Sequence, residues 1–176
     1  FKDLDDIKNT FQDFIGNLKD GGKLIIHTEQ DFLKINIDQN INKNILKLNA
    51  DQVEIDNIKL SVVGQHNRKN AQLVIALGNT LGLDNLKIRE GLKDFYGTWR
   101  RQEYKGKYFD MDFYDDYAHH PTEIMATMQA FYEKYKNRES ADYKKDAKLI
   151  AVFQPHLYSR TKLLFEDFSN SFAYAD

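Results

Sequence analysis

Residues 112–124, DFYDDYAHHPTEI, place two acids, a tyrosine and two histidines in succession before a proline. Side chains of these types could bind a metal ion or transfer protons in catalysis. Asp115 and Asp116 should point in opposite directions at a strand end, so one of them could accept hydrogen bonds from ribose hydroxyls, or could cap a helix. His119 and His120 lack the spaced partners of a typical metal site, and one of them could pack against or cap the helix that follows.

A second polar group, Gln154, Pro155 and His156 with Arg160, follows the apolar segment LIAVF. A guanidinium pairs with a carboxylate through two hydrogen bonds, so Arg160 with His156 could hold a carboxylate ligand. The alternative is an ordinary arginine at a helix start. Ligands bind at the carboxyl ends of strands in parallel α/β sheets, which would bring this group and DDYAHH to one rim.

The segment GQHNRKNA, residues 64–71, offers amide side chains for base recognition. Asn67 and Asn70 are three residues apart and share one face of a helix. Each amide has donors and an acceptor, the combination that reads adenine; the alternative is Asn67 as a helix N-cap and Asn70 as a surface residue. Arg100 and Arg101 could contact phosphates, or could belong to a solvated linker.

The first half of the chain should form helices around short strands. Apolar spacing predicts an amphipathic helix over residues 4–18, and KLIIH, residues 23–27, is typical of a buried strand. Between residues 31 and 63, the segments FLKINI, ILKLNA and VEIDNIKLSVV predict antiparallel strands in hairpins. Two helices should follow, over residues 67–82 and 84–95. The inward residues of the first of these two should be Leu73, Val74, Leu77 and Leu81.

The second half should form a βαβα unit after a polar connector, TWRRQEYKGKY. YFDMDFYD alternates like a strand, Pro121 should begin a helix, and LIAVF suits a parallel strand buried on both faces. A final helix should follow Gln154 and Pro155. This order predicts a parallel sheet with a right-handed crossover. The inward residues of the helix at Pro121 should be Ile124, Met128, Phe131 and Tyr135.

The chain has 176 residues, a formal net charge of −2 at pH 7 and no cysteine. That charge argues against a nucleic-acid binder, and the lack of thiols excludes disulfides and thiolate metal sites. No apolar run approaches the roughly 18 residues of a membrane helix, so we expect a cytoplasmic protein. A composition shift near residue 100 predicts two domains, residues 1–99 and 100–176. The two ends lack start and stop signals, so we expect a piece of a longer polypeptide.

Four segments, in this order and spacing, resemble the Mur ligases: GQHNRKNA, GTWRRQE, DDYAHHPTEI and VFQPHLYSRTKLLFEDF. The opening FKDLDDIKNTFQDFI resembles the segment after the family's Asp-His motif in its ATPase domain. The resemblance implies an α/β fold, namely the C-terminal part of a P-loop-type central ATPase domain followed by an incomplete Rossmann-like parallel α/β domain. The sequence contains no G-x-x-G-K-[ST] phosphate loop.

The resemblance also implies roles for individual residues. Nucleotide binding is implied for His66, Asn67, Asn70, Arg100, Arg101, Asp115, Asp116 and Tyr117, the first three on the adenine side. Asp116 is preferred over Asp115 for the ribose. Contact with the amino-acid substrate is implied for His119, His156 and Arg160, with Arg160 holding its carboxylate. Leu157 stands where many relatives have arginine or threonine, so the amino-acid pocket departs from the family pattern there.

The implied activity is that of an ADP-forming acid–amino-acid ligase. It would use ATP and Mg²⁺ to add L-alanine to UDP-N-acetylmuramate through an acyl phosphate in peptidoglycan precursor synthesis. These small molecules would be its partners, with no nucleic acid, membrane or obligate protein partner. No residue is a convincing catalytic residue or metal ligand, so we expect the piece alone to be inactive. The alternatives are a murein-peptide recycling ligase of the same family and a non-catalytic nucleotide-binding or interaction module.

Overall fold

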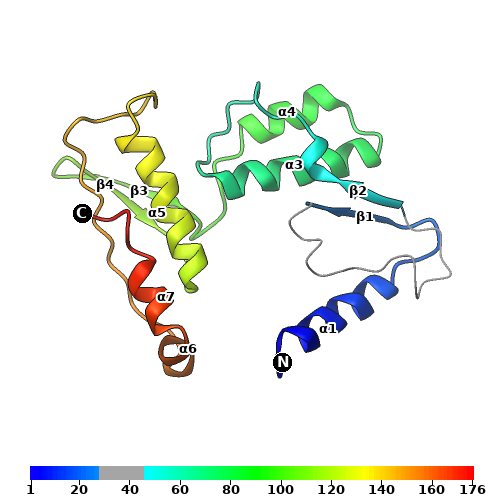
Figure 1. Cartoon of the computed structure of the whole chain (residues 1–176). Helices are drawn as coiled ribbons and strands as arrows, with labels where there is room; N and C mark the ends of the chain where they lie inside the picture. The colour runs from blue at the N-terminus through cyan, green and yellow to red at the C-terminus, as the bar shows by residue number, and fades with distance from the viewer. Residues whose placement is uncertain (28–45) are drawn as a thin grey trace. The chain divides into compact units, whose positions relative to one another are not determined.

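The computed structural model of the chain describes residues 1–27 and 46–176 (Figure 1). By compactness the chain divides into two units. Unit 1 comprises Phe1–Ile58 and Lys69–Gly91, and unit 2 comprises Lys59–Arg68 and Leu92–Asp176. The units interleave along the sequence, because the helix that begins at Gln65 starts in unit 2 and continues in unit 1. The division into residues 1–99 and 100–176 therefore stays a prediction.

Unit 1 combines a short parallel sheet with helices. Its elements are α1 (Leu4–Gly16), β1 (Lys23–Ile26), β2 (Leu46–Asn49), the 3-10 helix η2 (Ala50–Gln52), α3 (Gln65–Thr80) and α4 (Asn85–Lys93). α1 begins after Asp3, whose carboxylate accepts a hydrogen bond from the N–H of Asp6 (2.8 Å) and so caps the helix. Buried apolar residues from these elements and from the turn after η2 include Ile15, Ile26, Ala50, Ile55, Ile58, Ala71 and Ile75.

The imidazole of His27 joins β1 to η2 and α3. Its Nδ1 lies 2.5 Å from Asp51 Oδ1 and its Nε2 lies 2.9 Å from the backbone oxygen of Lys69. The residue is only 2% exposed, and a buried polar ring is tolerated only when its nitrogens have such partners. His27 therefore fixes the end of the parallel strand pair against α3.

The antiparallel hairpins predicted between residues 31 and 63 are wrong where the structure describes them. β2, which lies within ILKLNA, pairs in parallel with β1, and VEIDNIKLSVV forms no strand. The segment FLKINI lies outside the described residues. Ile55 and Ile58 are buried within a turn, in which the N–H of Ile58 donates to the oxygen of Ile55 (2.9 Å). The apolar spacing of this segment thus reflects a buried turn rather than a strand.

α3 buries a different face from the one that the sequence predicts. The buried positions are Ala71, Ile75 and Gly78. Val74, Leu77 and Leu81, which the sequence predicts to face inward, are instead 48%, 49% and 65% exposed. Gly78 allows α4 to approach closely, because a methyl group at this position would lie 2.5 Å from Ile88 Cδ1. The close approach at a glycine sets which face of α3 is buried.

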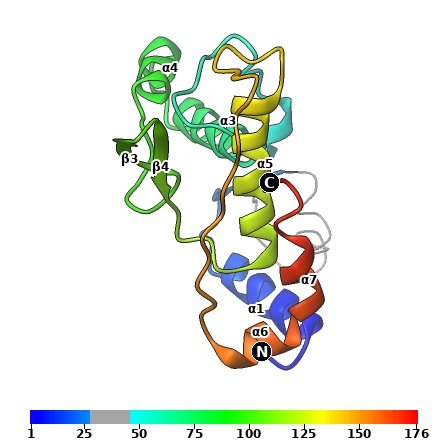
Figure 2. The same cartoon turned by 90° about the vertical axis from the view of Figure 1, so that its left-hand side faces the viewer.

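Unit 2 pairs a β-hairpin with a long helix and two short ones. Its elements are β3 (Glu103–Tyr108), β4 (Met111–Asp115), α5 (Pro121–Lys136), α6 (Tyr158–Leu163) and α7 (Phe165–Asn170). β3 and β4 are antiparallel, and the turn residues Phe109 and Asp110 both have positive φ (48° and 63°), as in a two-residue type I′ turn. α7 lies beside α5 in both views (Figures 1 and 2). Ile124 and Met128 of α5 pack there with Phe168 of α7.

The predicted βαβα unit is wrong, because the described residues of unit 2 contain no parallel strand pair. LIAVF, residues 149–153, is an irregular segment whose Ile150 and Val152 are 72% and 97% exposed. Its other three residues pack against the core between α5 and α7. A strand needs backbone hydrogen bonds to a neighbour, and LIAVF forms no such ladder with β4, which among the described residues pairs with β3 alone.

Other boundaries in unit 2 also differ from the predictions. The hairpin turn divides YFDMDFYD, and the predicted connector contains the whole of β3. The predicted final helix is two short helices, because the chain breaks at Leu164. α5 is confirmed: it begins at Pro121 and buries three of its four predicted inward residues, whereas Tyr135 is half-buried and its hydroxyl lies 2.6 Å from that of Tyr114.

Candidate functional site

Asp115 is the last residue of β4, Asp116 follows it, and the two face different partners, as the sequence predicts for neighbouring residues at a strand end. Asp115 Oδ2 lies 3.2 Å from Arg100 Nε. Asp116 accepts hydrogen bonds from the backbone N–H groups of Gln102 (2.8 Å) and Ala118 (2.7 Å) and from the hydroxyl of Thr127 (3.4 Å). Both carboxylates therefore hold the segment 98–103 at the end of β4.

The segment 98–103 has an uncommon backbone. Arg100 and Gln102 have φ values of 54° and 50°, in the left-handed region that non-glycine residues seldom adopt unless their surroundings hold them there. The N–H of Arg100 donates to Glu103 (2.9 Å), and its oxygen accepts from the N–H of Tyr117 (2.8 Å). The Arg100 guanidinium lies 4.9 Å from the centroid of the Tyr117 ring, a cation–π contact. Two residues with predicted nucleotide roles thus lie together.

Gln102 connects this segment to the first turn of α3. Its side-chain nitrogen lies 3.4 Å from His66 Nε2, and its side-chain oxygen accepts from Asn67 Nδ2 (3.4 Å). An amide nitrogen can only donate, so His66 Nε2 accepts and the ring is neutral in this contact. Burial lowers the pKa of His66, assisted by Arg101 and opposed by Asp116. His66 and Asn67 therefore lie beside the predicted phosphate-binding arginines.

Asn67 and Asn70 do not behave as one pair. Asn67 lies inside α3, which begins at Gln65, so the alternative of an N-cap at Asn67 is wrong. Its Nδ2 also donates to the oxygen of Val63 (2.8 Å), within unit 2. Asn70 is exposed and belongs to unit 1. The structure thus brings Asn67, but not Asn70, into the cluster of unit 2.

Of the residues predicted to contact the amino-acid substrate, the structure brings His119 and Arg160 together but leaves His156 apart. Arg160 Nη1 donates to the backbone oxygen of His119 (3.3 Å), which joins α6 to the segment before α5. His120 is the N-cap of α5, and its Nδ1 accepts from the N–H of Thr122 (3.3 Å), so the helix-cap alternative is confirmed for one histidine. His156 is exposed and makes no side-chain hydrogen bond within the described part of the chain.

Three site residues were missed by the sequence analysis: Gln102, Glu123 and Thr127. Glu123 Oε2 accepts from the N–H groups of His119 (3.0 Å) and His120 (3.3 Å), and Oε1 lies 3.7 Å from Arg101 Nη1. The spacing of Glu123, three residues after the N-cap, is that of a capping box and could have indicated it. No sequence signal indicates Gln102 or Thr127, because the Gln102 contacts depend on the fold of the segment 98–103 and the Thr127 contact depends on how α5 lies beside Asp116.

The arrangement suits an anionic ligand with a planar ring. The guanidinium groups of Arg100, Arg101 and Arg160 are tied to one short stretch, residues 115–123, and such groups bind phosphate and carboxylate through paired hydrogen bonds. Tyr117 is 50% exposed and offers a ring for stacking. Residues 1–27 and 46–176 contain no group of three or more His, Asp or Glu residues that could hold a metal ion.

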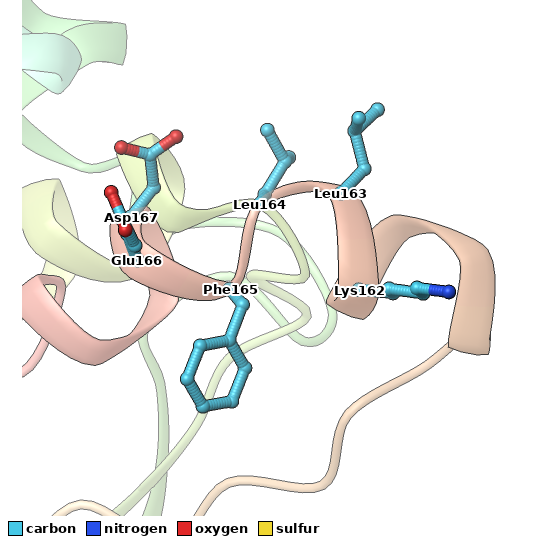
Figure 3. A pocket seen from close by; sticks show the side chains of 6 residues that line it. All are labelled: Lys162, Leu163, Leu164, Phe165, Glu166 and Asp167. Atoms are coloured by element: carbon cyan, nitrogen blue, oxygen red, sulfur yellow. The ribbon is translucent and has the colours of Figure 1, made fainter.

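A pocket of about 360 Å³ lies elsewhere, where α6 meets α7. It is lined by the consecutive residues Lys162, Leu163, Leu164, Phe165, Glu166 and Asp167. Their side chains fan out from the backbone and do not converge on a common point (Figure 3). None of the predicted site residues lines it, and a binding site normally needs convergent polar groups, so we do not assign a ligand to this pocket.

Comparisons with known proteins point to one family. No protein-family model matches the chain. Curated relatives named UDP-N-acetylmuramate–L-alanine ligase match the whole chain at 36% identity in Clostridium botulinum and 37% in Clostridium acetobutylicum, over 200 residues in each case. A relative of the same name in Agathobacter rectalis is 37% identical over 201 residues. The chain spans 41% of the length of these relatives.

Solved structures agree with the curated relatives. The UDP-N-acetylmuramate–alanine ligase of Thermotoga maritima superposes with a TM-score of 0.54 and 33% identity, over 68% of this chain and 24% of that one. A murein peptide ligase from Psychrobacter arcticus gives a TM-score of 0.58 over 100% of this chain and 40% of that one. Its identity of 21% supports a common α/β fold alone. No helix in the described ranges is long and apolar enough to cross a membrane.

Proposed function

Because the chain belongs to the Mur ligase family, we propose that it is part of an ATP-dependent ligase that joins L-alanine to UDP-N-acetylmuramate. The similarity of the whole chain to relatives of that name carries the proposal. The reaction would form ADP and supply a precursor of peptidoglycan, in the cytoplasm. Since the chain spans 41% of those relatives, we further propose that it is a piece that is inactive alone.

We assign the two parts of the chain to two domains of such a ligase. Residues 1–99 would be the C-terminal portion of a P-loop-type central ATPase domain, and residues 100–176 the beginning of a Rossmann-like C-terminal domain. The parallel pairing of β1 with β2 is consistent with the first assignment. The second assignment rests on the similarity of the whole chain to the relatives, because LIAVF forms no strand among the described residues of unit 2.

The nucleotide would lie against the segment 98–103 and the end of β4. Tyr117 would stack on the base, Arg100 or Arg101 would face ribose and phosphate, and His66, Asn67 and Asn70 would serve the adenine side. A carboxylate has about four lone-pair positions, so Asp116, which already accepts three hydrogen bonds, keeps about one for a ribose hydroxyl. Asp115 faces Arg100 and is the second candidate.

The amino acid would lie on the other side of Tyr117. Arg160 would bind its carboxylate, and His119 and His156 would face it. The contact between Arg160 and the oxygen of His119 supports this pairing. In the reaction, the muramate carboxylate would attack the γ-phosphorus of ATP to give an acyl phosphate and ADP. The amine of L-alanine would then attack the acyl carbon, and phosphate would leave.

The residues of this chain would bind and orient the reactants rather than react with them. Holding two reactants in position lowers the entropic part of the barrier, and cations stabilise charge that develops on phosphoryl oxygens. Mg²⁺ would accompany ATP, but no cluster of potential ligands exists among the described residues, so we assign its ligands to none of them.

Titration with Mg-ATP tests the nucleotide assignment. Trp99 is the single tryptophan, is 79% exposed and has the Arg100 guanidinium 5.9 Å from its ring. We expect a saturable change in Trp99 fluorescence, weakened about fivefold by Arg100→Ala because one charged contact is lost. Arg138→Ala, at another exposed arginine, is the control and should bind as the wild type. Absence of binding at millimolar ATP, by fluorescence and by calorimetry, would refute the assignment.

The murein-peptide ligase alternative differs in the amine substrate. Its structural neighbour shares only the fold with this chain at 21% identity, so it carries no argument about substrate. A competition experiment between L-alanine and a peptide that begins with L-alanine distinguishes the L-alanine ligase from the murein-peptide ligase. Tighter binding of the peptide would favour the alternative.

A further inference from the structure

The carboxylate of Glu123 contacts two parts of the candidate site at once. Its Oε2 accepts hydrogen bonds from the backbone N–H groups of His119 (3.0 Å) and His120 (3.3 Å). Its Oε1 lies 3.7 Å from Nη1 of Arg101. The two oxygens therefore face the proposed amino-acid side and the proposed phosphate side, respectively. A residue that served only as a helix cap would need the first contact alone.

The ring of His119 is oriented by acceptors at one nitrogen. Its Nδ1 lies 2.9 Å from the backbone oxygen of Tyr117 and 3.5 Å from Glu123 Oε2. Both atoms can only accept hydrogen bonds, so the hydrogen of the neutral ring resides on Nδ1 and the lone pair on Nε2. The peptide between His119 and His120 is also held, because Arg160 donates a hydrogen bond to its oxygen and its N–H donates to Glu123. Nε2 is thus the nitrogen available to a ligand.

Glu123 remains charged in these contacts. Burial of the carboxyl works to raise its pKa, but the N–H groups of His119 and His120 and the nearby charge of Arg101 help to outweigh burial. The pKa of Glu123 therefore lies below its ordinary value. An ionised carboxylate strengthens both the hydrogen bonds to the two N–H groups and the ion pair.

We propose that Glu123 is a positioning residue of the candidate site, which together with the backbone oxygen of Tyr117 sets the tautomer of the His119 ring and which places the Arg101 guanidinium. The purpose of this arrangement rests on the function proposed above. Nε2 of His119 would accept a hydrogen bond from the amino group of the amino-acid substrate. Arg101 would meanwhile be held toward a phosphate group, so a single carboxylate would coordinate the amine side with the nucleotide side.

The His119 spectrum tests the first half of the proposal without any ligand. Glu123→Gln keeps a carbonyl oxygen for the two N–H groups and removes the charge; Glu133→Gln, on the same helix, is the matched control. Ring ¹⁵N shifts of the neutral form should show mainly the Nδ1–H tautomer in the wild type and the control. In Glu123→Gln the ratio of tautomers should shift about twofold or more toward Nε2–H, since a charge-assisted contact is lost. An unchanged ratio would overturn the proposal.

A double-mutant cycle on Mg-ATP affinity tests the second half. Arg101→Ala and Glu123→Gln should each weaken binding, by about fivefold or less for an exposed ion pair. The double variant should bind no more weakly than Arg101→Ala, because both changes remove the same interaction. Strictly additive effects would contradict placement of Arg101 by Glu123.

If the wild type does not bind ATP, the proposed function fails, whereas the His119 spectrum still decides the role of Glu123. If Glu123→Gln does not fold, Glu123→Asp, with the same charge and a shorter reach, replaces it in both measurements.

Discussion

Between Asp115 and Glu123, the three acidic side chains each hold the segment 98–103 in place. Asp116 fixes the backbone of Gln102, Asp115 pairs with Arg100, and Glu123 faces Arg101. Two cations of the site, Arg100 and Arg101, are thus held by carboxylates of one short stretch, and Arg160 is held by a backbone oxygen of the same stretch. Such support from surrounding hydrogen bonds is what a binding site needs to hold its geometry.

Arg160 gives the most direct prediction at this scale. Arg160→Ala should weaken L-alanine binding by about tenfold or more and ATP binding much less, because a guanidinium–carboxylate contact is charge-assisted. Arg160→Lys should be intermediate, since an ammonium keeps the charge but not the paired geometry. Calorimetric titration with L-alanine and with ATP measures the affinity of each variant for each ligand. An equal loss for ATP, with L-alanine unaffected, would refute the carboxylate role.

His66 predicts a dependence of stability on pH. Its pKa in the folded chain is lowered from 6.5, so the unfolded chain binds a proton first as the pH falls. Stability should therefore decrease from pH 7.5 to 5.5, by less than the limit of about 1.4 kcal/mol per pH unit for one proton, since the ring is only half-buried. Thermal midpoints of the wild type should fall more steeply over this range than those of His66→Gln. Parallel curves would contradict the prediction.

At the scale of elements, the contact between α3 and α4 depends on Gly78. Gly78→Ala should destabilise unit 1 by about 1–3 kcal/mol, because the new methyl group would lie 2.5 Å from Ile88 Cδ1 and 3.0 Å from Cγ1, and displacing this side chain should cost more than the gain of about 0.5–1 kcal/mol in helix propensity. Gly91→Ala is the matched control on α4: nothing lies within 4 Å of the added carbon, and alanine is a better helix former by about 0.5–1 kcal/mol. Denaturant unfolding should show a lower free energy of unfolding for Gly78→Ala and a higher one for Gly91→Ala than for the wild type. If both variants change the free energy of unfolding in the same direction, the packing of α4 against Gly78 is contradicted.

Helices were easier to predict from the sequence than strands. α1, α3, α4 and α5 match the predicted segments because their apolar spacing and end signals are local. The parallel pairing of β1 with β2 and the hairpin of β3 and β4 depend on which segments meet, which alternation alone does not specify. Among site residues, Asp115, Tyr117 and Arg160 were identified by type and motif. Gln102 was not, since its role follows from the left-handed backbone of its own segment.

At the scale of the molecule, the residues predicted to bind the nucleotide are divided between the two compact units. His66, Asn67 and the arginines lie in unit 2, and Asn70 lies in unit 1. If Asn70 contacts the adenine, Asn70→Ala should weaken ATP binding by about 1–3 kcal/mol, the cost of a lost paired amide contact. Calorimetry on this variant and on Asn79→Ala, an exposed asparagine later in α3, distinguishes a specific effect from a general one. Equal affinities for the two variants and the wild type would remove Asn70 from the adenine side.

The central claim, that this chain binds a nucleotide and an amino acid at neighbouring positions in unit 2, is tested most directly by mapping amide chemical shifts with each ligand. Mg-ATP should shift the amides of residues 98–103 and 115–117, whereas L-alanine should shift those of residues 119–120 and 156–160. The two sets should adjoin at Tyr117. Shifts confined to the pocket of residues 162–167, or no saturable shift with either ligand, would contradict the account.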